Sequence, residues 1–161
     1  DNLGLAAACS SFCNEVQSRT SLQFECRILS LTRRLPSAVE LHLFRIVQEA
    51  INNITKHARA KSVKLRIRSQ KNSVVLKIED DGQGFDPKAP REGKKMRHGL
   101  GLTNIRERAL SMNGICEITS LPGRGTTISV RVPLASPKAG AKKNLNLKRK
   151  TVEGAKSSLP P

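Results

Sequence analysis

The chain has no tryptophan or tyrosine and only four phenylalanines, so aromatic side chains make up 2% of its 161 residues. Proteins that hold single-stranded nucleic acid by its bases stack those bases on aromatic side chains, and this sequence offers few of them. We therefore expect no nucleic-acid partner. The net charge of +16 still favours an anionic partner, such as a nucleotide or an acidic protein surface.

Long apolar runs are missing as well. No segment reaches the roughly 18 consecutive apolar residues of a membrane span, and no charged segment followed by an apolar one marks a leader. We therefore expect a soluble, cytoplasmic chain.

Metal-binding cysteine patterns are also lacking. The four cysteines, Cys9, Cys13, Cys26 and Cys116, form no C-x-x-C pair and have no histidine at zinc-finger spacing. We predict reduced, mostly buried thiols that pack as small hydrophobic groups. Cys9 and Cys13 are one helical turn apart, which predicts a shared packed face.

The positive charge divides the chain into a body and a basic tail. Residues 136–161 hold seven Lys or Arg and one Glu, so this tail contributes +6 of the net charge. Its few apolar residues and lack of a periodic face predict a disordered extension. A basic tail can also bind nucleic acid or an anionic membrane, but this composition favours a solvated segment without a fixed role. The body fits one domain with a single modest core.

Hydrophobic periodicity predicts three helices and five strands in the body. The helices are expected at residues 3–16, 37–58 and 99–112, and the strands at 22–29, 62–69, 73–80, 115–121 and 126–134. Ser37 is the expected N-cap of the long helix, and Glu40 completes a capping box. Its expected apolar stripe is Leu41, Phe44, Val47, Ile51, Ile54 and Ala58. The order of elements favours an α/β or α+β sandwich, with helices on one face of a mixed sheet.

The long helix contains a polar stripe with an unusual composition. Glu49, Asn53 and Lys56 share one side of the helix, with Asn52 beside them. Asparagine is a mediocre helix former, so two in succession indicate a role for the side-chain amides. A solvent-facing stripe remains the alternative when this helix is considered alone.

Two glycine-rich segments follow the polar stripe. Asp80 shares a strand face with apolar residues, so its carboxylate should point inward, and the turn after it contains Gly82 and Gly84. After a long polar segment at residues 85–98, expected to act as a lid, Gly99 and Gly101 begin a predicted helix. Helix N-termini favour phosphate groups. Each segment alone would fit an ordinary turn, but their order after the polar helix indicates a nucleotide site.

Four segments together, RIVQEAINNITKHA, EDDGQGFD, HGLGLTNIRERA and PGRGTTISVRVP, resemble the ATP-binding catalytic domain of sensor histidine kinases. That domain belongs to the superfamily shared with gyrase, Hsp-type chaperones and MutL ATPases. The nitrate-sensor-like and DesK-like kinases are the most similar subfamily. The resemblance covers residues 1–134. It implies a Bergerat-type sandwich of about five strands with three helices on one face, ATP bound with Mg²⁺, and phosphoryl transfer to a histidine.

The resemblance also implies roles for particular residues. Asp80 would accept a hydrogen bond from the adenine amino group, with Gly82 and Gly84 letting the adenine lie against the chain. Gly125 and Thr126 would complete that end of the site. At the phosphate end, Asn53 would bind Mg²⁺ through its amide oxygen, Asn52 would assist, Glu49 would orient or deprotonate the nucleophile, and Lys56 would lie near phosphate. The phosphates would meet the segment His98, Gly99, Leu100, Gly101 and Leu102.

By the same resemblance, residues 1–20 correspond to the end of a dimerisation helix and its connection, 21–135 to the catalytic domain and 136–161 to the tail. The family's phosphate-accepting histidine lies in a pattern like R-x-L-H-D, which does not occur here. We therefore expect the acceptor on a dimerisation domain outside this chain, relay to a response regulator, and a homodimeric full-length kinase that is open to membrane anchoring. The alternatives are an anti-sigma-factor-type serine kinase and a non-catalytic ATP-binding interaction module.

Overall fold

The computed structural model describes residues 4–29, 35–88 and 96–134. The predicted order of elements is confirmed within these ranges. The elements are α1 (Leu5–Arg19), β1 (Gln23–Ile28), α2 (Ser37–Asn53), the π-helical turn η1 (Ile54–Ala58), β2 (Ser62–Gln70), β3 (Ser73–Asp80), α3 (Met96–Ser111), β4 (Ile115–Ser120) and β5 (Thr126–Pro133). The predicted tail and residues 89–95 of the predicted lid lie outside the described residues.

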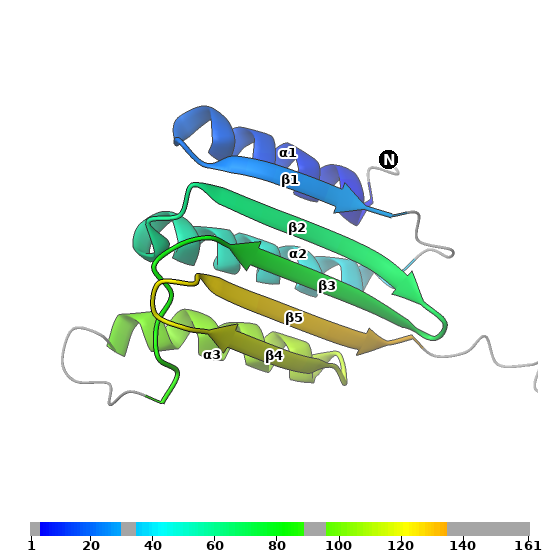
Figure 1. Ribbon diagram of the computed structural model, residues 1–161. Helices are drawn as coiled ribbons and strands as arrows, with labels where there is room; N and C mark the ends of the chain where they lie inside the picture. The colour runs from blue at the N-terminus through cyan, green and yellow to red at the C-terminus, as the bar shows by residue number, and fades with distance from the viewer. Residues whose placement is uncertain (1–3, 30–34, 89–95, 135–161) are drawn as a thin grey trace, which may run out of the picture.

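The five strands form one mixed sheet in the order β1-β2-β3-β5-β4. β1 and β2 are parallel and the other neighbouring pairs are antiparallel. A parallel pair needs a crossover connection, and α2 lies in the connection between β1 and β2. All three helices lie on the same face of the sheet (Figure 1). The predicted two-layer sandwich with a mixed sheet is therefore confirmed.

The core fills the space between the sheet and the helices. Alternate residues of the central strands point into it because side chains alternate along a strand. Fully buried members include Leu65 and Ile67 of β2, Leu76 and Ile78 of β3, and Ile105 of α3. On β5 and just after it, the alternate residues Ile128, Val130, Val132 and Leu134 are likewise buried.

The N-terminal end of α2 differs from the predicted capping box. The helix starts with Ser37, and Pro36 is the N-cap, with no side-chain hydrogen bond at the cap. The Pro36 carbonyl accepts a bond from the Glu40 N–H at 3.0 Å, so the helical bonding begins one residue earlier than predicted. Ser37 already has a helical backbone and does not cap the helix.

The apolar stripe predicted for α2 is also partly wrong. Leu41 is 56% exposed, and the buried residues are Leu43, Ile46, Val47, Ala50, Ile51 and Ile54. Two overlapping stripes fit the spacing of apolar residues in this sequence. Figure 1 shows α2 lying on the sheet between α1 and α3. This packing buries the stripe that contains Leu43, Ile46 and Ala50.

The remaining boundaries agree with the sequence to within a few residues. The predicted end of α3 is confirmed, because Asn113 takes a left-handed conformation with φ of 54° and the Gly114 N–H donates to the Ala109 carbonyl at 2.8 Å. All four cysteines are free, and Cys9 and Cys13 are buried as predicted. None of the helices in the described ranges is both long and apolar enough to cross a membrane.

Candidate functional site

The polar stripe lies where α2 passes into the π-helical turn. Asn53 is the last residue of α2, and the five residues of η1 follow it until Arg59 ends the helix with φ of 52°. The sequence predicts a helix to Ala58, and its extent is confirmed, but not the change to π geometry. Single π turns occur often at functional sites, because they shift the side chains that follow.

Asp80 ends β3 on the inner side of the sheet, as the strand pattern predicts. Its carboxylate accepts a hydrogen bond from the Gly82 N–H at 2.8 Å and another from the backbone of Thr126. Burial nevertheless raises the pKa of this carboxyl above its ordinary value of 3.8. Asp80 is therefore a half-buried acceptor whose carboxylate is held in place by backbone donors.

Two glycines in this region are required by the close approach of the two turns. A side chain on Gly84, whose φ is 58°, would collide with the Leu121 carbonyl. A side chain on Gly125, whose φ is 71°, would collide with the Asp80 carbonyl. The turns at residues 80–84 and 122–126 can therefore pack against each other only with glycine at these positions.

Ser120 joins the same two turns and was not predicted as a site residue. It is the buried polar residue of the described chain, at 4% exposure. Its hydroxyl accepts from the Phe85 N–H and donates to the Gly125 carbonyl, both at 2.9 Å. A serine at the end of a strand resembles ordinary turn chemistry, so the sequence holds no signal for this contact.

Gln83 and Asp81 fix the first turn to its neighbours and were also missed. The Gln83 side chain donates to the His57 carbonyl at 2.6 Å, and its backbone N–H donates to the Ala58 carbonyl at 2.7 Å. The Asp81 carboxylate accepts from the Lys61 and Ser62 N–H groups at 2.7 and 2.9 Å. Of the two successive acids, one therefore faces the site and the other anchors the turn.

Gly101 brings α3 against the polar stripe. A Cβ at this position would lie 2.6 Å from both Asn53 Nδ2 and Glu49 Oε1, so any larger residue would displace these two side chains. The predicted helix start at Gly99 is wrong, because α3 begins at Met96. Gly99 remains among the first four N–H groups, which have no partner within the helix, but Gly101 lies beyond them. Gly101 therefore acts by close packing rather than as a terminal donor.

The side chains of the polar stripe differ in burial. Asn53 Nδ2 is buried without a hydrogen-bond partner among the described residues. Glu49 is half-buried, whereas Asn52 and Lys56 are exposed. Leu102 packs against the core. His98 and Leu100 lie in the first turns of α3, and their predicted side-chain contacts fall outside what the structure describes.

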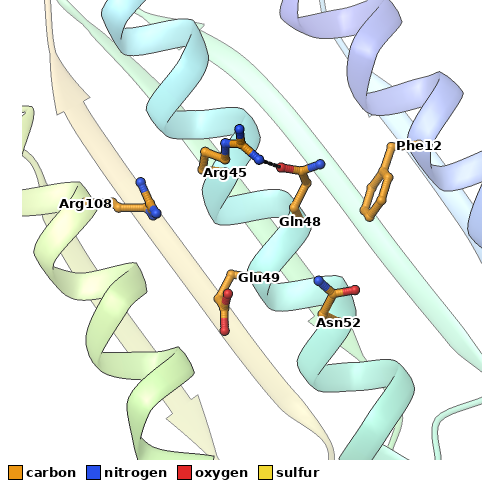
Figure 2. A pocket seen from close by; sticks show the side chains of 6 residues that line it. All are labelled: Phe12, Arg45, Gln48, Glu49, Asn52 and Arg108. Atoms are coloured by element: carbon orange, nitrogen blue, oxygen red, sulfur yellow. Dashed lines mark hydrogen bonds between the residues drawn. The ribbon is translucent and has the colours of Figure 1, made fainter.

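A hollow of about 450 Å³ opens beside Glu49, between α1, α2 and α3. It is lined by Phe12, Arg45, Gln48, Glu49, Asn52 and Arg108. Figure 2 shows Phe12 entering it from α1 and Arg108 from α3, with the other side chains on α2. Arg45 donates to Gln48 at 3.0 Å along the α2 wall. Glu49 thus lies against α3 at Gly101 and also lines this hollow.

The structure therefore brings the predicted residues together in two groups. Asp80, Gly82, Gly84, Gly125 and Thr126 form one end of the site, with the end of η1 beneath Gly82. Glu49, Asn53 and Gly101 form the other. Lys56 joins neither group through a contact that the structure describes.

Comparisons with known proteins point to one family. Residues 38–136 match the family described as histidine kinase-, DNA gyrase B-, and HSP90-like ATPase. The chain is 33% identical over 136 residues to the signal transduction histidine-protein kinase/phosphatase DegS of Brevibacillus brevis, a match that covers 84% of this chain and 34% of that protein. It is 40% identical over 101 residues to the sensor protein VraS of Staphylococcus haemolyticus, covering 63% of this chain and 28% of VraS. The chain thus spans about a third of the length of these relatives.

Solved structures share the fold. The histidine kinase domain of the Erythrobacter litoralis EL346 blue-light activated histidine kinase aligns with a TM-score of 0.64 at 22% identity, covering 81% of this chain and 61% of that one. The Acinetobacter baumannii histidine kinase AdeS aligns with a TM-score of 0.64 at 14% identity, covering 82% of this chain and 64% of that one.

Proposed function

Because the chain belongs to the family of histidine kinase-, DNA gyrase B- and HSP90-like ATPases, we propose that it is the ATP-binding catalytic part of a two-component histidine kinase. It binds ATP along the side of α2 that faces α3 and passes the γ-phosphoryl group to a histidine on a separate dimerisation domain. The observation that carries this proposal is Asp80, a half-buried carboxylate held by two backbone donors between glycine turns that leave no room for side chains.

Asp80 can recognise an adenine through its amino group. One carboxylate oxygen is engaged by the Gly82 N–H, which fixes the carboxylate plane. The remaining acceptor positions suit an N–H donor from a ligand, and an amino group that enters this half-buried site would otherwise lose its hydrogen bond to water. A side chain on Gly82 would collide with the Ala58 carbonyl, so glycine lets this turn close against the end of η1 and keeps the Asp80 carboxylate uncovered on that side.

The residues at the other end fit a magnesium ion. Mg²⁺ prefers oxygen ligands and keeps several waters, so one or two protein oxygens are sufficient. The Asn53 amide is buried, and its nitrogen lacks a partner among the described residues. Since the two ends of an amide exchange on rotation, this group can present its oxygen to the ion. When bound, Mg²⁺ would neutralise charge on the triphosphate.

Glu49 is the residue that we propose acts on the incoming histidine. Its carboxylate lies at the edge of the hollow that Arg45 and Arg108 flank, so an acceptor side chain can enter from there (Figure 2). In the transfer, the γ-phosphorus forms a bond to a histidine nitrogen as its bond to the β,γ-bridging oxygen breaks. Glu49 orients the histidine ring or accepts the proton from its other nitrogen, and ADP leaves.

The partners follow from the same proposal. The acceptor histidine belongs to a dimerisation domain outside this chain, the full-length kinase is a homodimer, and the phosphoryl group then moves to a response regulator. Membrane anchoring of the full-length protein is compatible with this arrangement and with the sensor-protein name of VraS.

The test is transfer in trans. The purified chain is incubated with γ-labelled ATP, Mg²⁺ and the dimerisation domain of a relative, and we expect acid-labile label on that domain and none on the chain itself. Base-labile, acid-stable label on a serine would instead indicate a serine kinase. ATP binding without any transfer would leave a nucleotide-binding module. Acid-labile label on His42, His57 or His98 of the chain alone would contradict the proposal that the acceptor histidine lies on a separate domain.

As the pH is lowered, ATP affinity should be lost at a higher pH than the ordinary pKa of aspartate would give. The acceptor role of Asp80 requires the ionised form, and burial raises the pKa of this carboxyl above 3.8. Affinity is therefore full above the raised pKa and is lost as the pH falls through it. Calorimetric titrations of ATP across the acidic range would measure this, with Asp80→Asn as the control that lacks the titration. A midpoint at or below 3.8 would contradict the assignment.

Asn53→Ala should weaken ATP binding about tenfold or more in Mg²⁺ and much less in EDTA, because the lost amide serves the metal rather than the base. The matched control is Asn52→Ala. The Asn52 side chain is exposed, so its removal should have a smaller effect on ATP binding. Titrations of both variants with and without Mg²⁺ would decide. Equal losses in Mg²⁺ and EDTA would remove Asn53 from the metal site.

A further inference from the structure

Two cysteines from different elements meet beneath the edge of the sheet. Cys13 lies on α1 and Cys26 on β1, and their Sγ atoms are 3.6 Å apart. A disulfide has an S–S distance of about 2.05 Å, so a shift of roughly 1.5 Å would bring the sulfurs to bonding distance. Side-chain rotation and small movements of a helix against an edge strand can supply such a shift.

The two thiols differ in access and in acidity. Cys13 is 1% exposed, whereas Cys26 is partly exposed on β1, the first strand of the sheet. The hydrogen bond between them lowers the pKa of Cys26 and raises that of Cys13. The thiolate is the reactive form of cysteine, so Cys26 is the group that an oxidant would meet first.

The other two cysteines lack this combination. Burial raises the pKa of Cys9 to about 12 and also raises that of Cys116. Cys116 lies on β4, at the opposite edge of the sheet from β1. Cys9 is on the same face of α1 as Cys13, one turn earlier, and is fully buried.

We propose that Cys13 and Cys26 form a peroxide-reactive dithiol that closes reversibly to a disulfide between α1 and β1. The Cys26 thiolate attacks the peroxide, takes one oxygen as a sulfenic acid and releases water or an alcohol. The Cys13 sulfur then attacks the sulfenic sulfur, and the sulfenic oxygen leaves as water. Two thiols and one peroxide thus give one disulfide, and a small thiol reductant restores the dithiol.

The bond would restrain α1, which forms one wall of the hollow beside Glu49. Phe12, the neighbour of Cys13, packs edge-to-face on Phe44 of α2 with ring centroids 6.0 Å apart and also lines that hollow. The bond closes the short loop between residues 13 and 26, so α1 can no longer separate from β1. The inference does not depend on the proposed kinase activity, and its test needs no nucleotide.

The test is thiol mapping on the whole chain. The reduced protein is treated with hydrogen peroxide, its free thiols are alkylated, and it is digested with trypsin. Cleavage after Arg19 and Arg27 leaves Cys26 on the peptide 20–27 and both Cys9 and Cys13 on the peptide 1–19. We expect these two peptides joined in wild-type protein and in Cys9→Ser, where only Cys13 can be the partner. The linked species should vanish in Cys26→Ser, persist in Cys116→Ser and revert with dithiothreitol.

A second readout does not depend on the variants folding well. Closing a loop of this size stabilises the native state, so peroxide should raise the Tm of wild-type protein by about 5 °C, reversibly. Four alkylated thiols after peroxide, a disulfide through Cys9 or Cys116, or Cys26 accumulating as a sulfinic acid beside a free Cys13 would each overturn the proposal.

Discussion

Glu49→Gln should lower phosphoryl transfer to a supplied histidine-bearing domain by about 10²-fold or more, with ATP affinity nearly unchanged. The substitution keeps the shape of the side chain but removes the charge that orients the acceptor or takes its proton. That interaction matters most in the transition state, so the loss should appear in the rate rather than in binding. Single-turnover transfer and calorimetric ATP titration on the same preparation would separate the two effects.

Glu40→Gln provides the matched control for Glu49→Gln. It removes the same charge from the same helix, but in the first turn of α2 and away from the hollow. Its transfer rate should stay within about twofold of wild type, because Glu40 precedes Glu49 by nine residues, about 14 Å along the helix, and a charge at that distance is largely screened. Transfer at full rate by Glu49→Gln would mean that the polar stripe of α2 has no chemical role.

Asp80→Asn should weaken ATP binding by about 1 to 3 kcal/mol, or roughly 5- to 150-fold. The carboxylate offers two oxygens, which serve the Gly82 and Thr126 N–H groups as well as the ligand. An amide offers only one oxygen, so one of these donors would face an NH₂ group. Calorimetry would give the affinity, and circular dichroism would show that the variant is folded.

Asp81→Asn is the control for that change, because it removes the charge of the adjacent acid, whose carboxylate accepts from Lys61 and Ser62 rather than facing the site. Asp81 accepts from Lys61 and Ser62, and the Ser62 N–H holds the pKa of its carboxyl below the ordinary value. Its contribution to stability is present above the unfolded pKa and is lost as the pH falls through the lowered one. This variant should fold less stably in neutral solution but bind ATP as wild type does. Equal ATP affinities for Asp80→Asn and wild type would remove Asp80 from the base-binding site.

Most of the fold could be predicted because strand alternation and glycine positions are local signals. β3 was expected at residues 73–80 and has those bounds, and its inward face placed Asp80 correctly. The helix stop at Asn113 was predictable for the same reason, since the left-handed conformation there suits asparagine.

What could not be predicted depends on contacts between distant segments. Ser120, Gln83 and Asp81 hold the turns through bonds to atoms that are far away in the sequence or buried. The sequence pattern predicts that α3 begins at Gly99, because glycines are common at helix ends, but the helix begins at Met96. Gly101 instead serves the packing of α3 on Asn53 and Glu49. The choice between two stripes on α2 was likewise made by packing rather than by periodicity.

The central claim is that the turns around Asp80 hold an adenine. Titration of the unmodified chain with ATP and with GTP, both in Mg²⁺, tests it most directly. Adenine presents an amino group where guanine presents a carbonyl oxygen, so Asp80 should accept from one and repel the other. We predict that ATP binds at least about tenfold more tightly than GTP, a difference of about 1.4 kcal/mol. Equal affinity for the two nucleotides would contradict the account.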